Sequence, residues 1–64
     1  MKPLTDVRVK LIGEDGNAFS ILGRVSKALR KAGHGDLAKK YLEEATSGDY
    51  SHLVQVTMEY VDVE

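Results

Sequence analysis

Apolar and basic residues alternate near the start of the chain, in the order Val7, Arg8, Val9, Lys10 and Leu11. A period of two with β-branched residues is typical of a half-buried strand. Pro3 has no N–H to give to a ladder, so we expect the strand over about Asp6 to Ile12. The polar run from Gly13 to Gly16 then predicts a turn.

The pattern next changes to a helical period, with apolar residues three and four positions apart: Ala18, Ile21, Leu22, Val25, Ala28, Leu29 and Ala32, flanked by Phe19. Asn17 precedes this run and is expected to cap a helix through its side-chain oxygen. Gly33 follows the run and is expected to end the helix in the left-handed conformation. Gly23 lies inside the helix, at a cost of about 1 kcal/mol relative to alanine.

A second helical stretch follows, with its apolar face at Leu37, Ala38, Tyr41, Leu42 and Ala45. Asp36 is expected to cap this helix, and Gly48 is expected to end it. The remaining positions of the helix are charged and are expected to face water: Lys39, Lys40, Glu43 and Glu44.

The segment Leu53 to Glu59 fits two periods. It alternates like a strand, but it also has a helical face formed by Leu53, Val54, Thr57, Met58 and Val61. The alternation slips between Tyr60 and Val61, where a strand would need a bulge. A helix from about Tyr50 to Glu59, capped by Asp49 and followed by a short strand Tyr60 to Val63, needs no bulge and is the preferred interpretation. The strand interpretation stays open at this point.

The fold class predicted from this order is α+β, a small single domain over residues 1–64. The expected order is β-α-α-α-β, with β-α-α-β as the alternative. Val61 and Val63 are expected to pair with the first strand in a two-stranded sheet that needs helix packing to be stable. The expected core is Val7, Val9, Leu11, Phe19, Ile21, Leu22, Val25, Leu29, Leu37, Tyr41, Leu42, Leu53, Val54, Met58 and Val61.

Composition narrows the class of protein. The 64 residues include no cysteine, which rules out disulfides and thiolate metal sites and is consistent with a cytoplasmic protein. No apolar run approaches the roughly 18 residues of a membrane span, so no membrane association is expected. The start of the chain reaches Asp6 and Arg8 too soon for a signal peptide.

The net charge of −1 hides an uneven distribution. Residues 18–40 carry six lysines or arginines against Asp36 alone, whereas residues 41–64 carry six acids and no lysine or arginine. This segregation predicts a molecule with a basic face and an acidic face.

Three strings carry a resemblance: Asp15-Gly16-Asn17-Ala18-Phe19, then Ala45 to Tyr50 followed by His52-Leu53, and the closing Val61-Asp62-Val63-Glu64. Together they resemble a family of small uncharacterised proteins from bacterial and phage genomes. The resemblance covers nearly the whole chain and implies no activity, ligand or site residue, since no function is known for that family. A phage or mobile-element setting would favour a small binding or regulatory protein.

The basic stripe of the first predicted helix, formed by Arg24, Lys27, Arg30 and Lys31, is the candidate nucleic-acid-binding site. Its alternative is a solvated helix face whose last-turn cations favour the helix dipole. A pI of 6.1 and the lack of an interleaved aromatic residue argue against general nucleic-acid affinity.

Asp49, Ser51 and His52 form the cluster with catalytic residue types. Because so short a chain has little room for a cleft, we expect Asp49 to act as a cap and predict no enzyme, cofactor or metal site. Tyr41, Tyr50 and Tyr60 are candidates for a contact surface or a core edge. The function expected is a non-catalytic protein-interaction or regulatory domain, able to self-associate as a homodimer or to bind an unidentified protein. The alternative is a weak nucleic-acid-binding protein.

Overall fold

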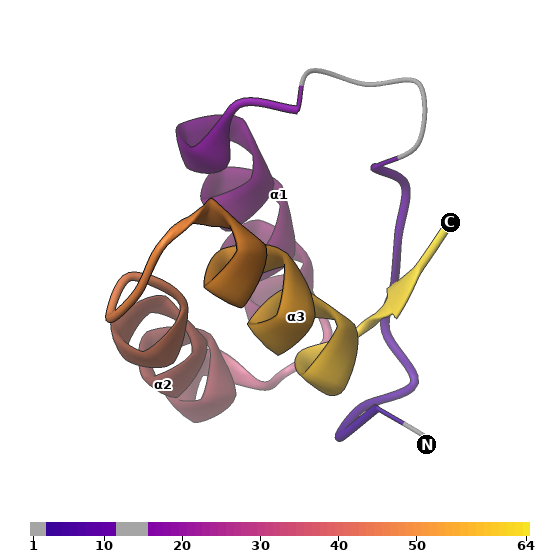
Figure 1. The fold of residues 1–64 in the computed structure, drawn as a ribbon. Helices are drawn as coiled ribbons and strands as arrows, with labels where there is room; N and C mark the ends of the chain where they lie inside the picture. Colours follow the sequence, from indigo (N-terminus) through magenta and orange to yellow (C-terminus); the bar gives the residue numbers. More distant parts are fainter. Residues whose placement is uncertain (1–2, 12–15) are drawn as a thin grey trace.

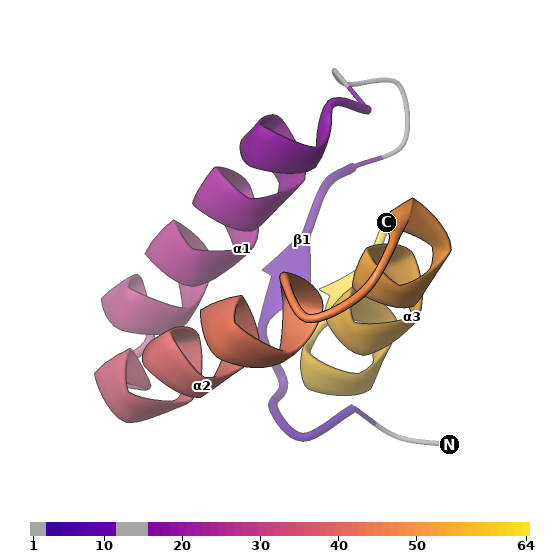
Figure 2. The same ribbon diagram turned by 60° about the vertical axis from the view of Figure 1, so that its left-hand side comes forward.

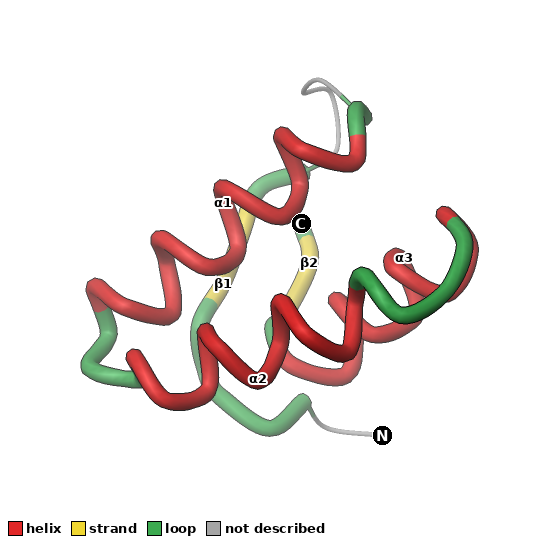
Figure 3. The backbone as a smooth tube through the Cα atoms, turned by 90° about the vertical axis from the view of Figure 1, so that its left-hand side faces the viewer, coloured by secondary structure: helices red, strands yellow, loops and turns green. Residues whose placement is uncertain are grey.

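A computed structural model describes residues 3–11 and 16–64 of the chain. Its elements in order are β1 (Arg8–Val9), α1 (Ala18–Lys31), α2 (Gly35–Ala45), α3 (Tyr50–Tyr60) and β2 (Asp62–Val63). The two strands lie side by side (Figure 3), and in Figure 1 they lie to the right of the three helices. This arrangement confirms the α+β class and the β-α-α-α-β order.

The two strands pair in parallel, so a segment near the beginning of the chain lies beside one near its end. Arg8 is opposite Asp62, and Val9 is opposite Val63. Figure 2 shows β1 running behind the helices, between α1 and α3. β1 packs against α1, and β2 packs against α3. The regular strand is shorter than the expected Asp6 to Ile12, because β2 offers only two residues in strand geometry. Ile12 and the predicted turn at 13–15 lie outside the described residues.

The predicted ends of α1 are confirmed. The side chain of Asn17 accepts a hydrogen bond from the N–H of Phe19 at 2.8 Å. Gly33 has a φ of +86°, and the N–H groups of Gly33 and His34 donate to the carbonyls of Arg30 (3.0 Å) and Leu29 (2.8 Å). This pair of bonds is the Schellman motif, which needs a left-handed residue such as glycine at the turn.

The prediction that Asp36 caps α2 is wrong. The N-cap is His34, whose carbonyl accepts the N–H of Ala38 at 2.9 Å, and none of the described side chains caps this end. Because His34 also closes α1, the turn between the helices is so short that α2 begins at Gly35. Asp36 therefore lies inside the first turn, where its negative charge still favours the positive end of the helix dipole.

The ambiguous segment is helical, as preferred, and the cap at Asp49 is confirmed by a 2.9 Å bond from the N–H of His52. The buried face of α3 differs from the expected one and consists of Leu53, Val56, Thr57 and Tyr60. Met58, expected in the core, is 60% exposed. The face is rotated toward Val56 and Tyr60, because the Tyr60 ring meets the Tyr41 ring and its hydroxyl donates to Glu44 Oε1 at 2.9 Å. Thr57 lies in the buried face as expected, 2.7 Å from the Tyr41 hydroxyl, and donates to the Leu53 carbonyl.

The core lies between the three helices and the helix-facing side of the sheet: Val9, Ile21, Val25, Leu29, Ala38, Tyr41, Ala45, Leu53, Val56, Tyr60 and Val61. The rings of Tyr41 and Tyr60 meet edge to face, with centroids 5.4 Å apart. Phe19, also expected in the core, is 83% exposed, because it lies outside the face of α1 that carries Ile21, Val25 and Leu29. Six further expected core residues are half-buried at its margin: Val7, Leu11, Leu22, Leu37, Leu42 and Val54.

Candidate interaction site

A basic groove of about 310 Å³ lies between β1 and α1. Its wall on the strand side is Arg8, Val9 and Lys10, and its wall on the helix side is Arg24, Lys27, Ala28 and Lys31. All the charged residues in this described lining are cations, and they are exposed. We call this surface the basic groove.

The helix side of the groove follows from helical spacing. Arg24, Lys27, Ala28 and Lys31 are at positions i, i+3, i+4 and i+7, which lie on one face of a helix. That face is adjacent to the buried face of α1, so the side chains reach solvent along the margin of the core. The small side chain of Ala28, half-buried between the cations, leaves the hollow open.

The strand side follows from the alternation of β1. Val9 is 5% exposed and points into the core, so Arg8 and Lys10 project from the opposite face of the strand. The groove therefore joins two segments of the chain, because β1 packs directly on α1.

Three of the four predicted nucleic-acid-binding residues line the groove: Arg24, Lys27 and Lys31. Arg30 is exposed but lies outside the lining, one position away from Lys31 on the helix. Arg8 and Lys10 line the groove as well but were not among the predicted site residues. The alternation that predicted the strand already placed them together on its outer face, but nothing in the sequence showed that α1 would lie beside them.

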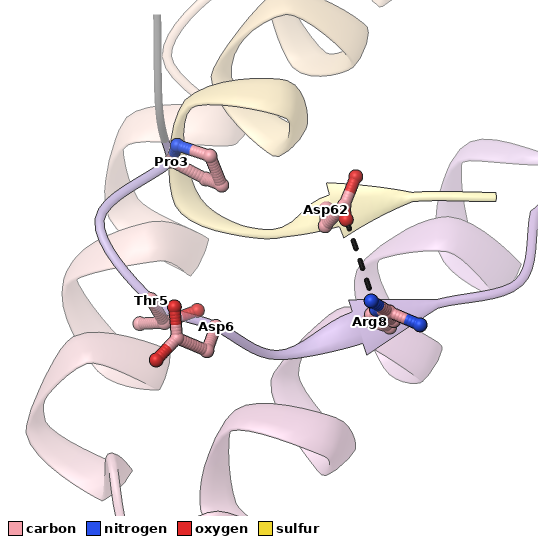
Figure 4. A pocket seen from close by; sticks show the side chains of 5 residues that line it. All are labelled: Pro3, Thr5, Asp6, Arg8 and Asp62. Atoms are coloured by element: carbon pink, nitrogen blue, oxygen red, sulfur yellow. Dashed lines mark ion pairs between the residues drawn. The ribbon is translucent and has the colours of Figure 1, made fainter.

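Arg8 also lines a second hollow, on the outer face of the sheet, with Pro3, Thr5, Asp6 and Asp62. Figure 4 shows the Arg8 and Asp62 side chains leaving neighbouring strands toward one another. Their ion pair is 3.9 Å long between Arg8 Nε and Asp62 Oδ2, and the side chains are 71% and 60% exposed. So long and exposed a pair contributes little to stability, and Arg8 stays available to both hollows.

The predicted cluster Asp49, Ser51 and His52 is held in the turn between α2 and α3. The Asp49 carboxylate caps α3, and His52 Nε2 lies 2.9 Å from the Glu44 carbonyl and 3.2 Å from Ser47 Oγ. Ser47 donates to the same carbonyl at 2.7 Å. The His52 ring thus faces the end of α2, whereas Ser51 is exposed. The arrangement joins two helices, and the described residues contain no group of three metal-ligating side chains.

The tyrosines separate into core and surface. Tyr41 and Tyr60 are buried, with 0% and 2% exposure. Tyr50 is 52% exposed and donates from its hydroxyl to the Gly16 carbonyl at 2.6 Å. With Phe19 it borders a shallow, mostly apolar hollow of about 280 Å³ between the first turns of α1 and α3.

Comparisons with protein-family models, curated proteins and solved structures gave no match for this chain. The resemblance to a bacterial and phage family therefore stays a prediction. Within residues 3–11 and 16–64, no helix is long and apolar enough to cross a membrane.

Proposed function

We propose that this chain is a non-catalytic interaction domain that binds an acidic segment of a partner protein in the basic groove. The observation that carries the proposal is the gathering of Arg8, Lys10, Lys27 and Lys31, with Arg24, around one shallow, open hollow. Grouped charges of one sign attract an oppositely charged partner and raise its local concentration. Such a surface gives fast, salt-sensitive association.

The rest of the molecule supports a binding role more than a catalytic one. The His52 and Asp49 side chains are engaged in fixing the α2–α3 turn. Among the described residues, the groove lining contains cations and apolar residues without a carboxylate or imidazole base. General acid–base catalysis needs a group held within hydrogen-bond reach of the reacting proton, whereas attraction of an anion needs only grouped cations, which the described lining provides.

The test is the binding of a short, fluorescently labelled oligoglutamate peptide, followed by anisotropy at about 50 mM and 200 mM salt, a range over which charge contacts weaken strongly. We expect saturable binding that weakens with salt. The variant Lys27→Glu/Lys31→Glu should lose roughly tenfold in affinity, which corresponds to about 1.4 kcal/mol. The matched control Arg30→Glu/Lys39→Glu makes the same change in net charge, but at residues outside the groove. Each variant replaces one cation in the last turn of α1, Lys31 in the first and Arg30 in the control. Equal losses in the two variants would reject the groove as the site.

The second candidate is weak nucleic-acid binding, favoured by the position of Arg24, Lys27 and Lys31 on one side of α1. Its footprint is small, because Arg30 lies outside the groove and no aromatic residue of the described lining can stack on a base. Labelled single- and double-stranded oligonucleotides in the same assay decide between the candidates. Tighter binding of oligonucleotides than of oligoglutamate would make nucleic acid the partner.

A further inference from the structure

Within the described residues, β1 has an open edge on the side that faces away from β2. The ladder to β2 uses every second residue: the carbonyls of Val7 and Val9 accept from Asp62 (2.8 Å) and Glu64 (2.9 Å), and the N–H of Leu11 donates to Glu64 at 2.7 Å. Backbone groups alternate in direction along a strand, so those of Arg8 and Lys10 point to the opposite edge. Within the described ranges the sheet has two strands, so no third strand pairs with that edge.

The open edge borders the basic groove. Arg8, Val9 and Lys10 form the wall of the groove nearest the strand, and α1 forms the other wall. A strand added to a sheet lies about 4.7–4.9 Å from its neighbour. A segment at that distance from β1 enters the groove, where Lys27 and Lys31 lie on its far side.

We propose that the partner segment binds in extended form, as a third strand on the open edge of β1, with acidic side chains next to the groove cations. The proposal rests on the proposed function and adds the mode of binding. Backbone hydrogen bonds to Arg8 and Lys10 supply affinity, and the alternation of acidic and apolar side chains supplies specificity, as in other cases of strand addition.

The molecule already contains a strand of this kind. On the other edge of β1, β2 places the exposed Asp62 next to Arg8 and the half-buried Val63 next to Val9. A segment that alternates acids and apolar residues therefore suits both edges of β1. A second copy of β1 does not suit the open edge, because it would bring Arg8 and Lys10 opposite like charges, which destabilises a strand pair.

The experiment uses the full chain, labelled with ¹⁵N, and a soluble peptide that alternates valine and glutamate. On binding, we expect hydrogen exchange at the amides of Arg8 and Lys10 to slow by about tenfold or more, because they gain partners. The amides of Val9 and Leu11, already bonded within the sheet, should change little. A twin peptide N-methylated at alternate residues keeps the charge but cannot complete the ladder and should bind about tenfold more weakly. A valine–lysine twin should not bind.

Each contrary result has a separate meaning. Equal binding of the N-methylated peptide, with unchanged exchange at Arg8 and Lys10, would overturn strand addition and leave the basic groove as a purely electrostatic site. No binding of the valine–glutamate peptide or of oligoglutamate would overturn the proposed function as well. Protection of Arg8 and Lys10 without peptide, together with a doubled mass in sedimentation, would assign the edge to a second copy of the chain and reject a foreign segment.

Discussion

At the scale of single residues, two glycines that look equivalent in the sequence have opposite roles. Gly23 lies inside α1, and a Cβ built there meets none of the described residues within 4 Å, so no close helix contact with them requires a glycine. A Cβ at Gly48 would lie 2.8 Å from two ring carbons of His52 and 2.9 Å from its Cβ. Gly48 is therefore needed so that His52 can approach the end of α2.

Alanine at each position should separate these roles. Gly23→Ala should raise the free energy of unfolding by about 0.5–1 kcal/mol, because alanine is the better helix former. Gly48→Ala should lower it by about 1–3 kcal/mol, the usual range for overpacking, and should displace His52 from the Glu44 carbonyl. Urea unfolding measures both variants. A Gly48→Ala protein as stable as the parent would show that the turn has room that the structure does not indicate.

The raised pKa of Tyr60 predicts how the free energy of unfolding changes at high pH. Burial, the hydrogen bond to Glu44 and the charges of Glu44 and Glu59 raise its pKa to about 12, whereas tyrosine in the unfolded chain ionises near 10. Because the folded pKa is the higher one, the stability contributed by the neutral ring is complete below about pH 10 and is lost as the pH rises toward about 12. Burial also raises the pKa of Tyr41, which adds a loss in the same direction.

The variant Tyr60→Phe removes the titrating group. It should be less stable than the parent at neutral pH by about 1 kcal/mol, through loss of the bond to Glu44. Its thermal midpoint should then fall less steeply between about pH 10 and pH 12. The parent and the variant share all other titratable groups, so the comparison isolates Tyr60. Parallel pH curves would contradict the assignment of the raised pKa to Tyr60.

At the scale of elements, the sequence was sufficient where a local signal decides the structure. Asn17, Gly33 and Asp49 end or begin helices through bonds to residues two to five positions away. The sequence was insufficient where contacts with a distant part of the chain decide which face of a helix is buried. The buried face of α3 includes Tyr60 because its ring meets the Tyr41 ring and its hydroxyl donates to Glu44, 16 positions away, and no period within α3 reveals those contacts.

The two aspartates near helix starts test this distinction. Asp49→Ala should lower the free energy of unfolding by about 1 kcal/mol, whereas Asp49→Asn, which keeps a capping oxygen, should lower it by only a few tenths. At Asp36, inside the first turn of α2, loss of the charge near the helix dipole should cost only about 0.3 kcal/mol. Alanine, the better helix former, should there be at least as stable as asparagine. Chemical unfolding of the four variants measures this, and an Asp36→Ala protein clearly less stable than Asp36→Asn would restore Asp36 as a cap.

At the scale of the whole molecule, the segregation of charge along the sequence identifies the cations of α1 but not those that β1 adds to the groove. The basic groove needs Arg8 and Lys10 from β1 beside Lys27 and Lys31 from α1, and that proximity comes from the packing of β1 on α1. The strand is in turn held by acidic β2, with Asp62 close to Arg8. One edge of β1 therefore pairs with β2, which carries Asp62, and the other edge borders the basic groove.

Such a grouping of like charges works against stability, which gives a prediction for the molecule as a whole. Lys27 lies three positions after Arg24, three before Arg30 and four before Lys31. The variant Lys27→Glu therefore replaces three repulsive helix pairs, each costing about 0.2–0.5 kcal/mol, by three attractive pairs of similar size. We expect this variant to be more stable than the parent by about 1–3 kcal/mol in low salt, with the gain reduced in high salt, while its binding of acidic peptide weakens. Lys40→Glu makes the same change in net charge on α2 but loses the attractive neighbours Asp36 and Glu44, and it should be destabilised. Thermal unfolding of the two variants at low and high salt measures the contrast. A Lys27→Glu protein that is less stable than the parent would show that the cations of the basic groove hold the fold together, and would remove the reason to regard their grouping as a binding surface.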